Sequence, residues 1–223
     1  SRGLGDVYKR QVPEYAYNLS LGIGKKINFN NIQLSFSSSS FLTILDNVIT
    51  KQSLEINGSS LIYYDSNYYE ILANQNSESG IVYGLSGSLF ITFFKNIKVH
   101  SSLCYTRGVL KNTQIPMSHI PPLFGKLNLN YTFKKIEFQI LNNFNAEKIN
   151  KLFGQGNTDN PLEASPMGYP SWWVINTQVG YQYRESLNLS LGVYNLLDIH
   201  YKTFASGISA PGRSLMASAK LSF

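Results

Sequence analysis

The chain has 223 residues, of which 43% are hydrophobic and 14% charged, and it contains 15 Tyr and 13 Phe. This composition is too apolar for a disordered chain. The net charge is +6, but the Lys and Arg residues stand singly and form no basic patch, so we expect no nucleic-acid partner. No apolar run approaches the roughly 18 residues of a transmembrane helix. Strand-forming residues dominate, which predicts an all-β protein.

The first residues differ in character from the rest of the chain. Residues 1–11 (SRGLGDVYKRQ) begin without Met and contain no charged-then-apolar signal segment. They resemble translated adapter sequence, so we expect a non-native leader there. We expect residues 12–223 to form one β-domain.

Alternation of apolar and polar residues begins directly after this leader. Every second residue is apolar in Tyr15–Ile23, and the same pattern returns in Ile81–Phe93 and Ile97–Tyr105. Short turns are predicted at Lys25–Asn31 and Phe94–Asn96. A period of two over about 9 to 11 residues is typical of a tilted strand that crosses a bilayer.

The clearest pair of strands follows in the middle of the chain. Leu123–Phe133 places Leu, Tyr and Phe on one face and Lys, Asn and Thr on the other. After Lys134 and Lys135 the phase of the alternation changes, and Ile136–Phe144 repeats the pattern. Two such segments joined by two residues predict a β-hairpin.

Three further strands are predicted toward the C-terminus. Trp173–Tyr183 and Leu187–Val193 alternate in the same way around a tight turn at Arg184–Ser186. The last segment, Ser214–Phe223, alternates as well. It ends on Leu221 and Phe223, and this ending resembles the C-terminal signal that the barrel-assembly machinery of outer membranes recognises. An ordinary edge strand is the alternative interpretation.

Aromatic residues favour a transmembrane barrel over a soluble β-sandwich, which also alternates. They gather at the ends of the apolar faces, where the two membrane interfaces would lie, and the middles are aliphatic. The predicted strands are also longer than the 5 to 6 residues that are usual in soluble sheets. The aromatic residues concerned are Tyr15, Tyr17, Tyr131, Phe133, Trp173, Tyr181 and Tyr183.

Connection lengths predict the topology, because outer-membrane barrels have short turns on one side and long loops on the other. The long loops are expected at Lys51–Asn67, Arg107–Pro122, Ala146–Pro170 and Asp198–Gly212. About nine strands result, with the first and the last both running toward the short turns. Such a set cannot close an antiparallel barrel, so we expect an incomplete wall of a larger transmembrane antiparallel β-barrel.

Short motifs near the C-terminus resemble the closing segment of TonB-dependent receptors. An Asn-Leu-hydrophobic-Asp element is followed by a Tyr and then by Pro-Gly-Arg before the last strand. The matching residues are Asn195, Leu196, Leu197, Asp198, Tyr201, Pro211, Gly212 and Arg213. The stretch Ile120–Gly125 (IPPLFG) resembles the start of a mid-barrel strand in the same family.

This resemblance implies an outer-membrane receptor of a Gram-negative bacterium, with this chain as the C-terminal part of a barrel of about 22 strands. Such a receptor binds a siderophore, haem or a similar iron chelate in its extracellular loops. A plug domain in the missing N-terminal region, coupled to TonB, is then remodelled to pass the chelate inward. A passive porin and a non-transporting adhesin or structural barrel are the alternatives.

Three loop residues are candidates for contact with an iron chelate. They are His119, His200 and Tyr201, because imidazole is a common haem ligand and the surrounding loops resemble those of haem receptors, although His is also common in loops. For Asp198, Pro211 and Gly212 we expect structural roles, with Asp198 bonding to local backbone as an Asx turn. No resident cofactor or metal site is expected.

No enzymatic constellation is present in the sequence. The three His residues, His100, His119 and His200, do not form an HExxH motif, and there is no GxSxG element. The glycine-containing stretch Phe153–Gly156 lacks the Lys and Ser of a phosphate-binding loop. The single Cys104 cannot form a disulfide within the chain. We therefore expect a protein that is not an enzyme.

Overall fold

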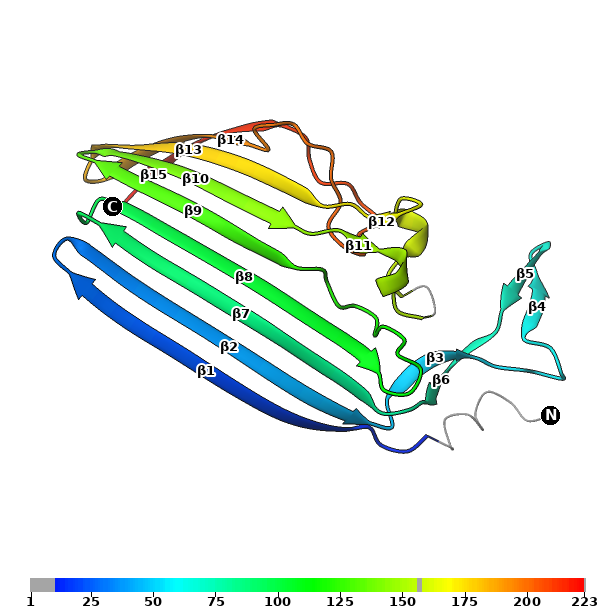
Figure 1. The fold of residues 1–223 in the computed structure, drawn as a ribbon. Coiled ribbons are helices and arrows are strands. Elements are labelled where there is room, and N and C mark those ends of the chain that lie inside the picture. Colours follow the sequence, from blue (N-terminus) through cyan, green and yellow to red (C-terminus); the bar gives the residue numbers. More distant parts are fainter. Residues whose placement is uncertain (1–10, 156–157, 223) are drawn as a thin grey trace.

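The computed structural model describes residues 11–155 and 158–222, so most of the predicted leader and the terminal Phe223 lie outside the described residues. Its main element is a nine-stranded sheet in which every neighbouring pair is antiparallel (Figure 1). The predicted number of long strands is confirmed. The strands in order across the sheet are β1 (Tyr15–Phe29), β2 (Ile32–Asp46), β7 (Gly80–Phe93), β8 (Ile97–Leu110), β9 (Phe124–Phe133), β10 (Ile136–Asn145), β13 (Trp172–Arg184), β14 (Leu187–Tyr194) and β15 (Ser214–Leu221).

Four short turns join these strands at one end of the sheet, at the left of Figure 1. They contain residues 30–31, 94–96, 134–135 and 185–186. Asn30, Phe94, Lys95 and Lys134 have positive φ angles of 50°, 47°, 67° and 54°. Asn tolerates this left-handed conformation, whereas Phe and Lys rarely adopt it. Turns of this hand match the twist of the strands that they connect, so pairing of the strands overrides the local preference.

Two strands are longer than the sequence indicated. The predicted turn Lys25–Asn31 is too long, because Lys25 and Lys26 continue the ladder opposite Phe36 and Ser35. In the same way β8 continues to Leu110, inside the predicted loop Arg107–Pro122. Charged residues near a strand end were interpreted as turn residues, but a backbone ladder accepts them as long as their side chains reach solvent.

The register aligns the alternation of all nine strands, so the sheet has one apolar and one polar face. One row across the apolar face is formed by Ile27, Leu34, Ile91, Val99, Leu129, Ile140, Thr177, Val193 and Leu215. The adjacent row on the polar face is formed by Asn28, Gln33, Thr92, Lys98, Asn130, Gln139, Gln178, Gly192 and Met216. A slip of one residue in any pair would exchange the two faces.

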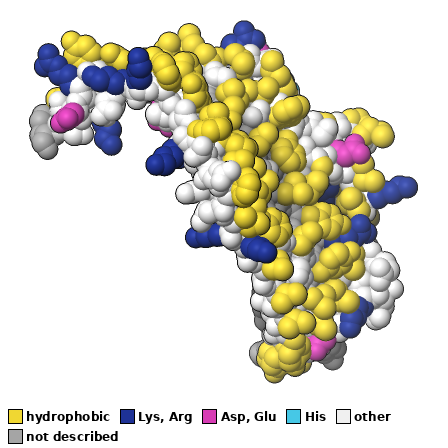
Figure 2. Space-filling model, turned by 60° about the vertical axis from the view of Figure 1, so that its left-hand side comes forward, with side chains coloured by type: hydrophobic (Ala, Val, Ile, Leu, Met, Phe, Trp, Pro, Cys, Tyr) yellow, Lys and Arg dark blue, Asp and Glu magenta, His cyan; other side chains and the backbone are white. Residues whose placement is uncertain are grey.

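The apolar face is not covered by a second layer in the described part of the chain. Leu19 and Leu21 are each 72% exposed, and Figure 2 shows hydrophobic side chains spread over much of one side of the molecule. A β-sandwich would bury this face against another sheet, so the sandwich alternative is wrong. The buried hydrophobic residues among those described lie at the loop end; they are Val48, Leu110, Tyr169 and Val174.

Aromatic residues mark both ends of the apolar face. Tyr15, Tyr17 and Trp173 lie toward the long loops, whereas Phe93 and Phe133 lie beside the short turns. The described residues form no α-helix, and only two short 3-10 turns occur, η1 (Asn150–Leu152) and η2 (Pro161–Glu163). No helix in the described ranges is long and apolar enough to span a membrane.

The sheet is open, with β1 at one edge and β15 at the other. Nine antiparallel strands leave both edge strands running toward the short turns, as the sequence predicted. Two strands that run in the same direction cannot pair antiparallel, so these nine strands do not close on themselves. Closure requires additional strands, and in an antiparallel barrel their number must be odd.

A candidate ligand site among the long loops

Four long connections lie at the opposite end of the sheet from the short turns (Figure 1). They comprise residues 47–79, 111–123, 146–171 and 195–213. The first is longer than predicted and contains two small hairpins, which pair β3 (Ile49–Ser53) with β6 (Leu72–Asn76) and β4 (Leu61–Tyr64) with β5 (Asn67–Glu70). The predicted alternation of short and long connections is confirmed.

A fully buried carboxylate joins two of these loops. Asp159 has no exposed surface. Its Oδ1 accepts the backbone N–H of His119 at 2.7 Å, its Oδ2 accepts that of Gly154 at 2.8 Å, and Lys148 Nζ lies 3.5 Å from Oδ2. Lys148 also donates a hydrogen bond to the carbonyl of Ile120. The loop between β8 and β9 is therefore tied to the loop between β10 and β13.

Burial opposes the charged state of Lys148 in this ion pair. Burial lowers the pKa of Lys148, and the neighbouring Asp159 carboxylate partly opposes this shift. Removing one partner of a buried pair leaves the other as an uncompensated charge, which costs about 3 to 5 kcal/mol. The pair therefore favours this arrangement of the two loops over other packed arrangements that would leave one of the two charges buried without its partner.

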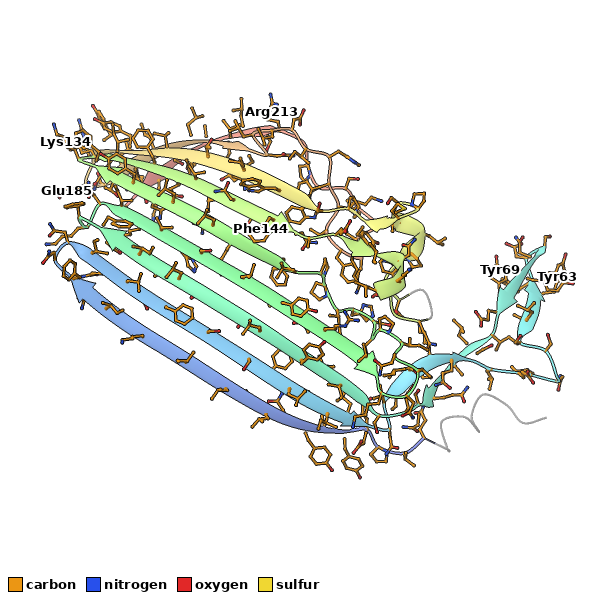
Figure 3. All side chains as sticks on the ribbon, in the orientation of Figure 1. Tyr63, Tyr69, Lys134, Phe144, Glu185 and Arg213 are labelled. Atoms are coloured by element: carbon orange, nitrogen blue, oxygen red, sulfur yellow. The ribbon has the colours of Figure 1, made fainter. Side chains whose placement is uncertain are left out.

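Aromatic contacts attach the loop between β14 and β15 to these two loops. The rings of Phe153, Tyr169 and Phe204 form a cluster with centroid distances of 5.7, 5.4 and 6.5 Å. Lys148 Nζ lies 4.2 Å from the centre of the Phe204 ring, and Lys202 forms a 2.9 Å ion pair with Glu163. Residues 111–123, 146–171 and 195–213 therefore form one packed unit, here named the loop assembly (Figure 3).

The long β2–β7 connection rests against this unit. Val48 Cγ2 and Met117 Sδ would lie only 3.2 and 3.4 Å from a Cβ at Gly80, so both side chains pack over the polar face where Gly80 leaves space. Glu78 accepts hydrogen bonds from Thr113, including its backbone N–H at 3.1 Å. The hydroxyl of Thr113 is the main cause that lowers the pKa of the Glu78 carboxyl.

A hollow of about 290 Å³ lies between the base of the β2–β7 connection and the loop assembly. Its polar lining comes from two sides, with Thr50, Lys51 and Asn74 on the β3–β6 hairpin and Ser118, His119, Gln155 and Thr158 on the loop assembly. The hydroxyl of Thr158 donates to the carbonyl of Gln155 at 2.9 Å. The described residues that line the hollow include no Asp or Glu.

The three predicted ligand residues lie in different surroundings. His119 lines the hollow, with its backbone in the left-handed region at a φ of 61° and its N–H fixed by Asp159. The Tyr201 ring packs against Trp172 in a tilted arrangement, with 4.6 Å between the ring centroids. His200 Nε2 pairs with Ser209 Oγ at 3.0 Å. A ligand role for any of the three stays a prediction.

The motif residues of the last loop fasten its two ends together. Asn195 is 4% exposed; its amide nitrogen donates to the carbonyls of Ile199 and Pro211 at 2.9 and 3.1 Å. Asp198 Oδ1 accepts the backbone N–H of Arg213 at 2.7 Å. This hydrogen bond joins the start of the loop to its end. It stands in place of the local Asx turn expected for Asp198. A Cβ at Gly212 would lie 3.0 Å from Asp198 Oδ1, so a larger residue there would crowd this carboxylate.

An exposed hairpin of tyrosines projects from the loop end, as Figure 3 shows for Tyr63 and Tyr69. The rings of Tyr63 and Tyr68 lie 5.1 Å apart on one face of β4–β5, and those of Tyr64 and Tyr69 lie 6.5 Å apart on the other. Tyr64 and Tyr68 are 71% and 72% exposed. Burial of these side chains therefore stabilises the hairpin only slightly.

Sequence reasoning missed most of the residues that shape the hollow. Lys51 is the first residue of the predicted loop Lys51–Asn67, whereas Asn74 lies between that loop and the predicted strand Ile81–Phe93, and nothing in the sequence pairs the two residues. Asp159 stands among Asn, Thr and Gly and carries no motif. A usable signal existed only for the tyrosine hairpin, because two pairs of strand-forming residues flank Asp65–Asn67, a typical turn sequence.

Comparison with known proteins agrees with this architecture. The family model "TonB dependent receptor-like, beta-barrel" matches residues 6–196. The chain is 25% identical over 170 residues to the probable TonB-dependent siderophore receptor PirA of Acinetobacter baumannii, a match covering 70% of this chain and 22% of that protein. It is 35% identical over 79 residues to the probable TonB-dependent receptor BfrD of Bordetella pertussis, covering 33% of this chain and 11% of that protein.

A solved structure shares the fold as well. The copper transporter OprC superimposes with a TM-score of 0.73 at 19% identity, covering 97% of this chain and 32% of OprC. The chain therefore spans about a third or less of the length of these relatives. An open wall of antiparallel strands with an apolar and a polar face, matched by the family model over most of its length, identifies the chain as a member of the TonB-dependent receptor β-barrel family, a family of transport receptors.

Proposed function

We propose that this chain supplies nine strands to the barrel of an outer-membrane receptor that imports an iron chelate, either a siderophore or haem. Family membership carries this proposal, and the sequence relative PirA is named as a siderophore receptor. A plug domain and TonB, both outside this chain, would provide the gate and the energy.

The two faces of the sheet fit such a barrel in a Gram-negative outer membrane. The apolar face would contact acyl chains, and its aromatic ends would lie at the two interfaces. The polar face would line the lumen and contact the plug. The short turns would then be periplasmic and the loop assembly extracellular. The barrel-assembly machinery would recognise the C-terminal segment that contains Leu221 and Phe223.

The ligand would be bound among the long loops. His119 lines the hollow, and His200 and Tyr201 belong to the loop assembly next to it. Imidazole and phenol groups are known haem ligands, and the same groups can donate hydrogen bonds to a siderophore. We propose these three residues as ligand contacts.

Growth on iron chelates tests the import function. The full-length gene is expressed in an iron-starved host that lacks its own receptors, and growth on siderophore iron or haem is measured with and without TonB. We expect growth on at least one chelate only when TonB is present. Growth that is indifferent to TonB would indicate a passive pore, and no gain of growth on any chelate would contradict import.

A further inference from the structure

Basic residues that are scattered along the sequence gather at the short-turn end of the sheet. In the described part of the chain this end carries the carboxylates of Glu137 and Glu185, and the other carboxylates lie in or beside the long connections. The basic residues of the short-turn end are Lys25, Lys26, Lys95, Lys98, Lys134, Lys135, Arg184 and Lys220. This end is therefore strongly positive, although the sequence itself shows no basic patch.

A β-bulge turns Arg184 toward the apolar face of the sheet. Regular alternation after Gln182, a polar-face residue, would place residue 184 on the polar face as well. The register instead shifts between these two residues, and Arg184 pairs with Leu187 of the apolar face. Bulges commonly re-aim side chains in this way. The guanidinium carbon lies 5.4 Å from the centre of the Tyr183 ring, a cation–π contact that favours this position of the charge.

The neighbouring turn holds a second cation on the same side. Lys134 Nζ lies 5.4 Å from the centre of the Phe133 ring, and Phe133 is an apolar-face residue that is 50% exposed. Lys134 lies at the short-turn end in Figure 3. The β9–β10 and β13–β14 turns are adjacent, because the backbone N–H of Gln182 donates to the carbonyl of Lys135 at 2.8 Å. The two cations therefore belong to one stretch of the rim.

The charges of this stretch are available to a ligand. Lys134 and Arg184 form no ion pair with another described residue. A guanidinium group binds phosphate oxygens in bidentate geometry, and an ammonium group binds them as a point charge. Phe133 and Tyr183 continue the apolar face directly beside the two cations. Positive charge at a rim with an apolar surface beside it matches the two parts of a lipid, an anionic headgroup and its acyl chains.

From these observations we propose that the β9–β10 and β13–β14 turns bind the phosphate group of an anionic phospholipid in the periplasmic leaflet, with Lys134 and Arg184 as its contacts. This inference rests on the membrane orientation given under the proposed function, and it adds a lipid site that import does not require. An acidic polymer of the periplasm would approach the tips of the turns. The contacts of both cations with apolar-face rings favour the lipid instead.

Titration of the purified receptor with lipids tests this site. The full-length receptor in detergent micelles is titrated with phosphatidylglycerol or with zwitterionic phosphatidylcholine, and bound lipid is measured by native mass spectrometry. The test variant is Lys134→Gln/Arg184→Gln, and Lys134→Arg/Arg184→Lys keeps both charges. Lys26→Gln/Lys98→Gln is the matched control, because it removes two charges from the same end of the sheet but from the polar face.

We expect the receptor to prefer phosphatidylglycerol, and Lys134→Gln/Arg184→Gln to raise its Kd about thirtyfold. Each basic residue beside an anionic lipid surface contributes about fivefold to affinity. The charge-preserving variant and the polar-face control should bind this lipid as the unchanged receptor does. Equal losses in the two Gln variants would overturn the proposal, because they would show an effect of overall charge.

Two other outcomes would also overturn the lipid site. One is equal affinity of the unchanged receptor for both lipids. The other is binding to isolated cell-wall polymer that depends on Lys134 and Arg184 while the Kd for phosphatidylglycerol does not. The titration involves no transport, so either result would leave import standing. Growth on chelates that is indifferent to TonB would defeat import, and a positive titration would still support the lipid site.

Discussion

At the scale of single residues, Asp159 joins two loops of the loop assembly. It is fully enclosed, and it satisfies two backbone N–H groups and one lysine at the junction of two loops. In Asp159→Ala the charge of Lys148 would be buried without a partner. We expect the loop assembly to lose about 3 to 5 kcal/mol of stability against local opening, measured by amide hydrogen exchange of residues 146–171 in detergent micelles.

Glu147→Ala is the matched control for this prediction, because Glu147 is an exposed carboxylate next to Lys148. It should change the free energy of local opening of these loops by less than about 0.5 kcal/mol, as is usual for surface substitutions. Slow exchange in the nine-stranded sheet should persist in both variants. Equal protection of the loops in Asp159→Ala and in the unchanged protein would show that the ion pair does not hold them together.

At the scale of elements, the two hairpins of the β2–β7 connection should differ in stability. The β3–β6 hairpin is anchored at its base, where the backbone N–H of Ser77 donates to the carbonyl of Val48 at 2.7 Å. The β4–β5 hairpin has four residue pairs and both faces exposed. A two-stranded hairpin without a packed face is marginally stable in water.

We therefore expect amides of β4–β5 to exchange with solvent much faster than those of β3–β6, and proteases to cut first near Tyr64 on intact cells. Replacing Tyr63, Tyr64, Tyr68 and Tyr69 by Ser should leave the exchange of the nine-stranded sheet unchanged, since the ring contacts of these tyrosines lie within the hairpin itself. Protection of β4–β5 equal to that of the sheet would mean that another part of the full receptor covers the tyrosines.

At the scale of the whole molecule, the separation of long loops and short turns makes the membrane topology testable. In a Cys104→Ser background, single cysteines are placed at Tyr64 in the hairpin and at Lys135 in a short turn. On intact cells, a membrane-impermeant thiol reagent should label the cysteine at 64 and not the one at 135, although both should react after lysis. Labelling of both positions before lysis would contradict a bilayer-spanning sheet.

Much of the fold was predictable from the sequence because a strand's side chains alternate with a period of two, and nine strands repeat that period. The row from Ile27 to Leu215 is continuous in space because each strand separately carries the correct phase. Strand ends were predicted less well. Lys25 and Arg107 have turn-like charges, but the ladder includes them, since pairing with neighbouring strands is not visible in a local window.

The candidate site depended on the tertiary structure. His119 was found from its residue type. Its partner Asp159 lies 40 positions later in the sequence, and Lys51 precedes His119 by an even larger separation. Contacts of this kind come from how the loops pack, and loops have no periodic pattern that would encode them. The sequence by itself determined a sheet with one apolar and one polar face and long loops at one end, because these follow from alternation and turn residues. Only the tertiary structure decided that the loops form one assembly and that a hollow lined by Lys51 and His119 lies beside it, because those features depend on long-range packing around a buried charge.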